Sequence, residues 1–210
     1  MPHILGHVNL KTKKSLIEFS EHFLKNWKIQ SLDYDIKRCI KKENGNSSPL
    51  PALMYCFAII DMMGALIAGE AIKGNTTGNS KKYLLDFMNY PKDETNLLWD
   101  KIFRHKITHL STPETGIRYQ GKIISWNLHD ENPSNHLKII WNKETITIGN
   151  NCGRIKIHGK FVINIIKLKE DIIDSILRPK DGYLERLKTD KNLQKNFKTA
   201  INQIYEVRNK

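Results

Sequence analysis

Cysteine is scarce in this chain of 210 residues, and its few cysteines form no metal-binding pattern. Cys39, Cys56 and Cys152 are odd in number, and no two of them have CxxC spacing. Nothing resembling a secretory signal precedes them. These absences argue against a secreted domain held together by disulfides, and we expect the protein in the reducing cytoplasm.

Sequence signatures of common cofactors and nucleophiles are missing as well. The chain contains no GxGxxG, no phosphate-binding loop, no GxSxG and no kinase-type motif. Their absence argues against dinucleotide, nucleoside triphosphate and serine hydrolase chemistry. We therefore expect a protein that works without a cofactor.

An uninterrupted hydrophobic run is also lacking. The most apolar stretch, Leu50 to Ile72, is broken by Asp61, Gly64, Gly69 and Glu70. A buried core helix explains such a stretch better than a membrane span does, so we expect no membrane association. The two glycines are expected to permit close packing of helices.

Acidic residues are outnumbered by basic ones. Lysine and arginine total 34 against 22 aspartates and glutamates, which gives a formal net charge of +12 and a pI near 9.5. This basic character favours encounter with RNA or another polyanion through long-range attraction. Because the lysines are spread along the whole chain, a solvated basic surface explains the charge equally well.

Helical periodicity is what the sequence has in abundance. Apolar residues recur every three or four positions around 12–30, 36–40, 50–72, 83–88, 93–110, 165–176 and 193–207. Between Gly116 and Phe161 the pattern changes to short β-rich runs separated by Gly and Asn. A chain of this length is expected to bury one core. We predict a single mainly α domain over residues 1–210, a helical bundle with a small antiparallel β-rich insertion at residues 116–161.

The best candidate for a functional centre is the segment from Arg104 to His109, with sequence RHKITH, in the last turns of the helix expected at 93–110. Arginine binds phosphate through two parallel hydrogen bonds, and histidine moves protons near neutral pH. On an ideal α-helix Arg104 and His109 lie about 140° apart, so their side chains can converge on one phosphate without stacking. The negative end of the helix dipole favours a protonated His109, which suits an acid. The pair fits metal-independent RNA cleavage by attack of the ribose 2′-hydroxyl.

The pattern Arg104-His105-x-x-x-His109 resembles the HEPN superfamily. Ribonuclease members of that family carry an Arg, commonly followed by a polar residue, and a His four to six residues later in a helical bundle. The resemblance covers roughly residues 50–178, where an apolar helix precedes the motif helix. The stretch from Leu98 to Leu110 is also similar to uncharacterised bacterial HEPN-like proteins.

This resemblance implies a fold, an activity and partners. It implies a HEPN-like helical bundle and an endoribonuclease with Arg104 and His109 as catalytic residues and His105 as a polar support. It also implies a homodimer in which two motif helices face one cleft. A role in toxin or defence biology follows by the same resemblance, with a protein partner such as an antitoxin.

Two other interpretations of the motif remain open. Arg104 could pair with Asp100 one turn earlier, which would leave a non-catalytic HEPN-like module that binds nucleic acid or protein. His105 and His109, four residues apart on one helical face, could instead bind a metal. Lys106, however, occupies the place of the glutamate in HExxH, and no nearby group supplies a third ligand.

The β-rich stretch offers a second candidate surface. Trp126 and Trp141 alternate with lysines there and could form a stacking platform for single-stranded RNA. Aromatic residues on strands also commonly fill a core, so both interpretations stand. Several histidines outside the motif have no evident catalytic partner and receive no role: His22, His129, His136 and His158.

Overall fold

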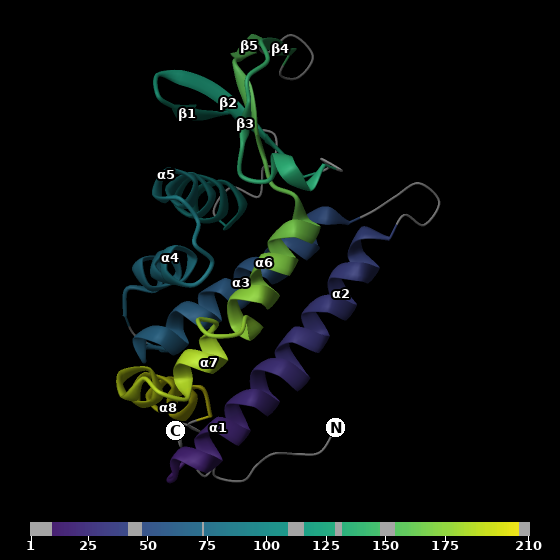
Figure 1. Ribbon diagram of the computed structural model, residues 1–210. Helices are drawn as coiled ribbons and strands as arrows, with labels where there is room; N and C mark the ends of the chain where they lie inside the picture. Colours follow the sequence, from purple (N-terminus) through teal and green to yellow (C-terminus); the bar gives the residue numbers. More distant parts are fainter. Residues whose placement is uncertain are drawn as a thin grey trace, which may run out of the picture. The chain divides into compact units, whose positions relative to one another are not determined.

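A computed structural model of the chain describes residues 10–41, 48–72, 74–108, 116–128, 132–147 and 154–205 (Figure 1). For residues 104–108 and 146–147 the description covers the backbone alone. With 64% helix and 13% strand, the chain is mainly α, as predicted.

Helices make up most of the described residues. The α-helices are α1 (Lys13–Glu21), α2 (Gln30–Ile40), α3 (Pro49–Ala68), α4 (Thr76–Asp86), α5 (Lys92–Asn96), α6 (Ile165–Leu177), α7 (Tyr183–Leu187) and α8 (Lys191–Tyr205). Two segments, η1 (His22–Ile29) and η2 (Leu97–Thr108), have the wider hydrogen-bond pattern of a π-helix, and η3 (Pro133–Asn135) is a single 3-10 turn.

The chain forms two compact units. The first unit comprises Met1–Asp35, Ala58–Asn89 and Ile172–Lys210, and the second unit comprises Ile36–Phe57 and Tyr90–Asp171. Three boundaries fall inside helices α2, α3 and α6, and the one between Asn89 and Tyr90 lies in the connection from α4 to α5. The single domain over residues 1–210 therefore stays a prediction.

The first helical segment begins where the sequence predicts it and ends later. Thr12 caps α1, because its hydroxyl accepts a hydrogen bond of 3.1 Å from the amide of Ser15. The predicted end near Gln30 is wrong, since α1, η1 and α2 follow one another without a break to Ile40. No glycine or proline lies between Thr12 and Ile40 to stop the helix.

Helix α4 also begins earlier than expected, in a stretch whose composition predicts a flexible connection. The side chain of Asn75 caps it by accepting a hydrogen bond of 2.9 Å from the amide of Gly78. Further along α4, the Tyr83 hydroxyl hydrogen-bonds Ser175 in α6 at 2.5 Å, and both residues are fully buried. This polar pair fixes α4 in the core of the first unit.

Helix α3 is the most apolar element of the fold. By length and composition it could cross a membrane, with a mean hydropathy of 1.9. In the folded chain 56% of that window is buried, and Leu53, Phe57, Ile60 and Met63 are fully covered. This burial favours the predicted core helix over a membrane span.

Close packing of α3 against α4 depends on Gly64, as the sequence indicates. A Cβ atom built at Gly64 would lie 2.7 Å from the backbone nitrogen of Ser80 and 2.8 Å from its Cα. Those atoms belong to a helix backbone and cannot rotate away. Beside this contact, the Ser80 hydroxyl donates a hydrogen bond of 2.7 Å to Asp61.

We predict that Gly64→Ala lowers the free energy of unfolding by about 3 kcal/mol, because overpacking a rigid contact outweighs the helix propensity of alanine. Urea denaturation of the two proteins measures the difference. Ala58→Ser, at an exposed position of the same helix, is the control and should change stability by less than about 0.5 kcal/mol. Equal stability of Gly64→Ala and the parent would contradict the packing described.

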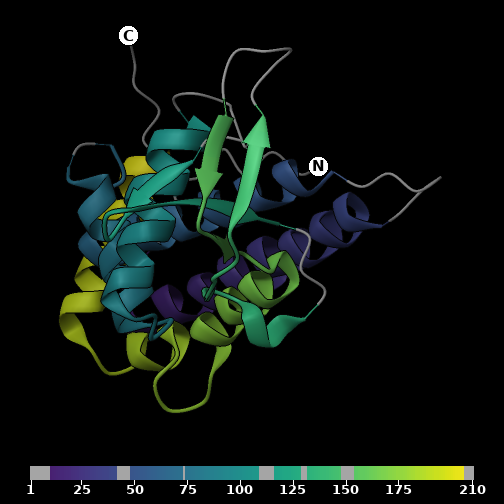
Figure 2. The ribbon, with the colours of Figure 1, turned by 90° about the horizontal axis from the view of Figure 1, so that it is seen from above.

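The strands all lie in the second unit, within the β-rich stretch that the sequence predicts. They are β1 (Ile117–Tyr119), β2 (Lys122–Asn127), β3 (Ile139–Ile140), β4 (Glu144–Thr147), β5 (Arg154–Ile157) and β6 (Gly159–Val162). One sheet has the order β1-β2-β6-β3, and β4 pairs with β5 in a separate antiparallel ribbon. Figure 2 shows this ribbon as two neighbouring arrows of opposite direction.

The prediction that the insertion is antiparallel is wrong for its central pair. Strands β2 and β6 run parallel, with Ile124 opposite Gly159 and Trp126 opposite Phe161. Parallel neighbours require a long crossover, and the segment that carries β3, β4 and β5 provides it. Short strands of the same composition are compatible with either direction, so the sequence pattern does not distinguish them.

Candidate functional site

The candidate motif lies on a helix that α5 and η2 build together. The helix begins after Pro91, with Asp93 and Glu94 in its first turn. The positive end of the helix dipole stabilises carboxylates there. Asp93 therefore lies in the first turn and does not cap the helix. The described part of the helix ends at Thr108.

Buried aromatic rings hold this helix in the second unit. Trp99 is fully buried, and its ring centre lies 5.6 Å from that of Phe57 in α3 and 4.5 Å from that of Phe103. Phe57 and Phe103 are themselves 4.4 Å apart. The three rings form one cluster directly before Arg104 in the chain.

The structure places the motif residues only in part. Arg104 and His105 belong to η2, whose backbone is described at these positions, whereas His109 lies outside the described residues. The roles of Arg104, His105 and His109 stay predictions. So does the alternative ion pair between Arg104 and Asp100.

The hydrogen-bond pattern of η2 changes the expected geometry of the motif. An α-helix turns once in about 3.6 residues, and the i→i+5 bonds of a π-helix widen each turn. Side chains five positions apart are then closer to alignment along the axis than on an α-helix. Because His109 lies outside the described residues, its angle to Arg104 stays a prediction. Single π-helical turns frequently occur at functional sites, and longer π-helical runs are rare.

Metal binding receives no support from the described side chains. Among them, no group of three or more His, Cys, Asp or Glu could hold a metal ion. His105 and His109 are not among those side chains, so the metal interpretation of this pair is neither strengthened nor removed.

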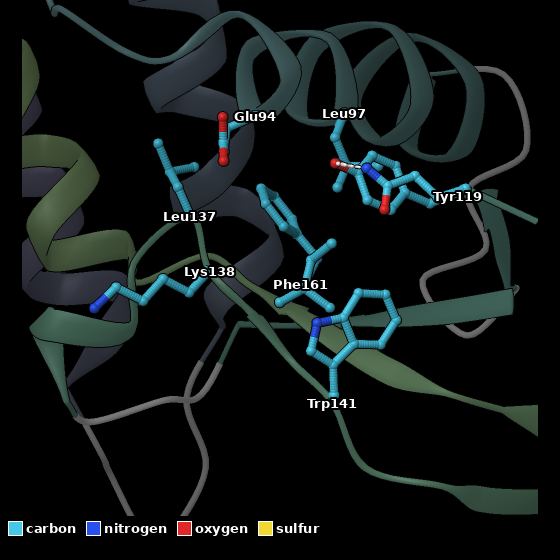
Figure 3. A pocket seen from close by; sticks show the side chains of 9 residues that line it. Glu94, Leu97, Tyr119, Leu137, Lys138, Trp141 and Phe161 are labelled. Atoms are coloured by element: carbon cyan, nitrogen blue, oxygen red, sulfur yellow. Dashed lines mark hydrogen bonds between the residues drawn. The ribbon is translucent and has the colours of Figure 1, made fainter. Parts of the chain in front are cut away.

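A pocket opens at the start of the motif helix, within the second unit (Figure 3). Its volume is about 340 Å³. Residues of the helix, the β1–β2 hairpin and strands β3 and β6 line it: Glu94, Leu97, Tyr119, Gln120, Leu137, Lys138, Ile139, Trp141 and Phe161. Figure 3 shows Glu94 and Leu97 reaching in from the helix, with the Trp141 ring on the opposite side and Phe161 between them.

Of the two tryptophans proposed as a stacking platform, only Trp141 is available. Trp126 is 8% exposed because it shares the inward face of β2 with Ile124, so it fills the core. Trp141 is 49% exposed and follows the last residue of β3. The Lys122 ammonium lies 4.4 Å from its ring centre, in a cation–π contact.

Two residues that line the pocket have positive φ angles, which residues other than glycine rarely adopt. Gln120 has φ 47° and Leu137 has φ 60°. Gln120 and Gly121 (φ 73°) form the two-residue turn between β1 and β2, where Tyr119 pairs with Lys122. Such a turn prefers Asn or Gly at its first position, so glutamine there is unexpected. Strained positions of this kind cluster at ligand-binding sites.

Burial and nearby carboxylates favour the protonated hydroxyl of Tyr119. Burial first, and then the neighbouring carboxylates of Asp93 and Glu94, raise the pKa of Tyr119 above its ordinary value. Its oxygen accepts a hydrogen bond of 3.2 Å from the Gln120 side-chain amide. As in any tyrosine at neutral pH, the phenol carries a proton that it can donate.

Sequence reasoning missed a polar network around His136. The backbone amide of Asn164 donates a hydrogen bond of 3.0 Å to Nδ1 of His136. Nε2 of the same ring lies 3.0 Å from the Tyr90 hydroxyl. The Tyr90 hydroxyl in turn donates a hydrogen bond of 2.9 Å to the Asp171 carboxylate. That carboxylate also accepts a hydrogen bond of 2.5 Å from the Lys167 ammonium. Both nitrogens of His136 are engaged, so we interpret the network as structural. The hydrogen bonds of His136 and Tyr90 join residues 28 to 81 positions apart in the chain, which hides them from motif analysis.

We predict that His136 makes the protein sensitive to acid. Burial, opposed by Asp171 and helped by Lys167, lowers the pKa of His136 from 6.5 to about 4. The unfolded chain therefore binds a proton more readily than the folded one. The contribution of His136 to stability is complete above pH 6.5 and is lost as the pH falls to about 4, by up to about 3 kcal/mol.

Denaturation of the parent protein and of His136→Asn at pH 7 and pH 4 measures this contribution. The variant should be less stable at pH 7, and the gap should close at pH 4. A gap that is the same at both values would show that His136 does not titrate as described.

No protein-family model, curated protein or solved structure matches the chain. The interpretation of the motif helix and the pocket therefore rests on their residues and geometry.

Proposed function

We propose that the protein is a metal-independent endoribonuclease of the HEPN type. The observation that carries the proposal is Arg104 on the π-helical segment η2, with His109 five residues later in the sequence. A π-helix brings positions five apart toward alignment, which suits two side chains that act on one phosphate. The resemblance of the motif to the HEPN superfamily supports the same activity.

In the proposed reaction the RNA supplies its own nucleophile. The 2′-hydroxyl loses its proton to water and its oxygen bonds to the adjacent phosphorus, while the bond from phosphorus to the 5′-oxygen breaks. Arg104 binds the phosphate and offsets charge on the pentacoordinate phosphorus. His109 donates the proton that the departing 5′-oxygen takes up, and His105 supports the pair. The products are a 2′,3′-cyclic phosphate and a 5′-hydroxyl.

The proposal includes a homodimer. In the family that the motif resembles, two motif helices face one cleft, so each protomer contributes an Arg104 and a His109. A net charge of +12 assists this arrangement by attracting RNA to the protein.

Cleavage in excess chelator tests the activity. Purified protein is incubated with structured and unstructured 5′-labelled RNA in EDTA, beside the same RNAs with 2′-O-methyl riboses. We expect fragments with cyclic phosphate ends from the unmodified RNA alone, because methylation removes the attacking hydroxyl. Cleavage that requires added metal, or that also cuts the methylated RNA, would overturn the mechanism.

A folded protein that cuts neither RNA would favour the other expectation, a non-catalytic module that binds nucleic acid or a protein. Sedimentation of the protein alone tests the homodimer separately.

A further inference from the structure

The pocket beside the motif helix has no part in the proposed cleavage chemistry, yet its lining combines features of a base-binding site. We propose that it binds one guanine base of single-stranded RNA, stacked on Trp141, close to the phosphodiester that is cut. The inference rests on the proposed function for its class of substrate, RNA, and on the pocket for the base.

Exposure of Trp141 is the first argument. A tryptophan ring that is 49% exposed at the wall of a cavity leaves much of its apolar surface in water. Stacking a base on such a ring contributes to the affinity of single-stranded nucleic acid, whatever the base. The volume of about 340 Å³ lies at the small end of ligand sites and admits a nucleotide but no folded RNA.

The polar groups of the pocket favour guanine among the four bases. Glu94 is half-buried, and its carboxylate only accepts hydrogen bonds. Guanine presents two adjacent donors, N1–H and the 2-amino group, which match the two oxygens of a carboxylate. The side-chain oxygen of Gln120 and the hydroxyl of Tyr119 add an acceptor and a donor beside it.

Charge orients the nucleotide in the pocket. Asp93 and Glu94 make the helix side acidic and disfavour a phosphate there. On the sheet side, Lys122 sits over the Trp141 ring and Lys138 lines the cavity, and both are exposed. We expect the base edge to point toward the helix and the phosphate toward these lysines.

The position of Gln120 supports a binding role. Its left-handed backbone conformation costs stability, which asparagine or glycine would reduce. A glutamine, whose side chain is longer than that of asparagine, is explained at this position if its amide contacts a ligand in the cavity. Gln120→Asn should therefore keep or raise stability and weaken binding, a combination that a merely structural glutamine would not give.

The pocket and the motif share one helix. Leu97 lines the pocket, and Arg104 follows seven residues later on η2, a distance on the order of 10 Å along the axis. A base held in the pocket therefore lies beside the helix that carries Arg104.

Binding of RNA that cannot be cleaved tests the inference. The probe is a fluorescein-labelled 2′-O-methyl oligouridine with one central guanosine, compared by anisotropy with versions that carry inosine or uridine there. We expect Trp141→Ala to weaken binding about tenfold or more. Trp27→Ala is a matched control, because Trp27 is 44% exposed and also carries a lysine, Lys28, 5.3 Å from its ring centre. It does not line this pocket.

Guanosine should bind about tenfold better than inosine, which lacks the 2-amino group, and Glu94→Gln should remove this preference. Unchanged binding by Trp141→Ala, equal losses in Trp141→Ala and Trp27→Ala, or no preference for guanosine would each overturn the inference. Because the probe is uncleavable, binding as expected without cleavage of ordinary RNA would overturn the proposed nuclease alone. Cleavage with a KM that Trp141→Ala leaves unchanged would overturn the base-binding role of the pocket and leave the proposed nuclease standing.

Discussion

His109→Ala is expected to slow RNA cleavage by about 10² to 10⁴, because general acid catalysis by a positioned histidine contributes rate enhancements of that size. Arg104→Ala should slow it by about 10² to 10³, since it removes the cation that stabilises charge on the phosphorus. The measurement is the single-turnover rate on a labelled RNA in EDTA. If the two residues act on one phosphate, the double variant should lose much less than the product of the single losses.

Control variants separate chemistry from general damage. His22→Ala and Arg154→Ala replace exposed residues of the same two types away from the motif helix and should leave the rate within about twofold. His105→Ala should cost about tenfold, as a support that orients its neighbours. A wild-type rate in His109→Ala would remove this residue from the mechanism, and a rate that recovers with added zinc would instead support the metal interpretation of His105 and His109.

Trp99→Ala is expected to lower the free energy of unfolding by about 3 to 5 kcal/mol, the range for deleting a large buried aromatic ring. Trp99 is fully buried between Phe57 and Phe103, so the cavity cannot fill with water. Because this cluster directly precedes Arg104, cleavage should also fall at temperatures where the variant is still folded. Guanidinium denaturation and activity on the same samples measure the two effects.

Trp99→Phe separates ring packing from the polar atom of the indole. The Nε1 atom of Trp99 is buried and has no hydrogen-bond partner among the described residues. Phenylalanine removes this unsatisfied donor, so its cost should be clearly smaller than that of alanine. Trp27→Ala, at an exposed ring, should cost less than about 1 kcal/mol. Equal losses in Trp99→Ala and Trp27→Ala would contradict the cluster as the anchor of the helix.

Helix positions in this chain could largely be predicted from local rules, and the errors have local causes. The cap at Thr12 and the apolar core helix α3 follow from short-range patterns. The join between η1 and α2 was missed because a weakening apolar stripe resembles a helix end, although no residue there breaks a helix. π-helical geometry in η2 has no sequence signal that apolar spacing reveals.

Pairing of the strands could not be predicted, because it depends on contacts distant in sequence. The β-rich region is evident from composition, but the parallel register of β2 and β6 depends on how the whole insertion folds. The burial of Trp126 and exposure of Trp141 follow from that register, so the sequence left the two rings equivalent.

In the candidate site too, local features could be predicted and contacts between distant segments could not. Arg104, His105 and His109 are neighbours in sequence and were found as a motif. The pocket gathers residues from four separate segments between Glu94 and Phe161, and no local pattern connects them. Only the folded chain brings a carboxylate, an amide and an exposed tryptophan around one cavity.

The parallel pairing of β2 with β6 also has a consequence for the order of assembly. The turn at Gln120 and Gly121 joins neighbouring strands and can close in microseconds, whereas Ile124 must find Gly159, 35 residues later. Ordering that crossover costs loop entropy before any contact rewards it. We therefore expect the cavity under Trp141 to be completed late in folding, so that a nascent or partly folded chain would lack its base-binding surface.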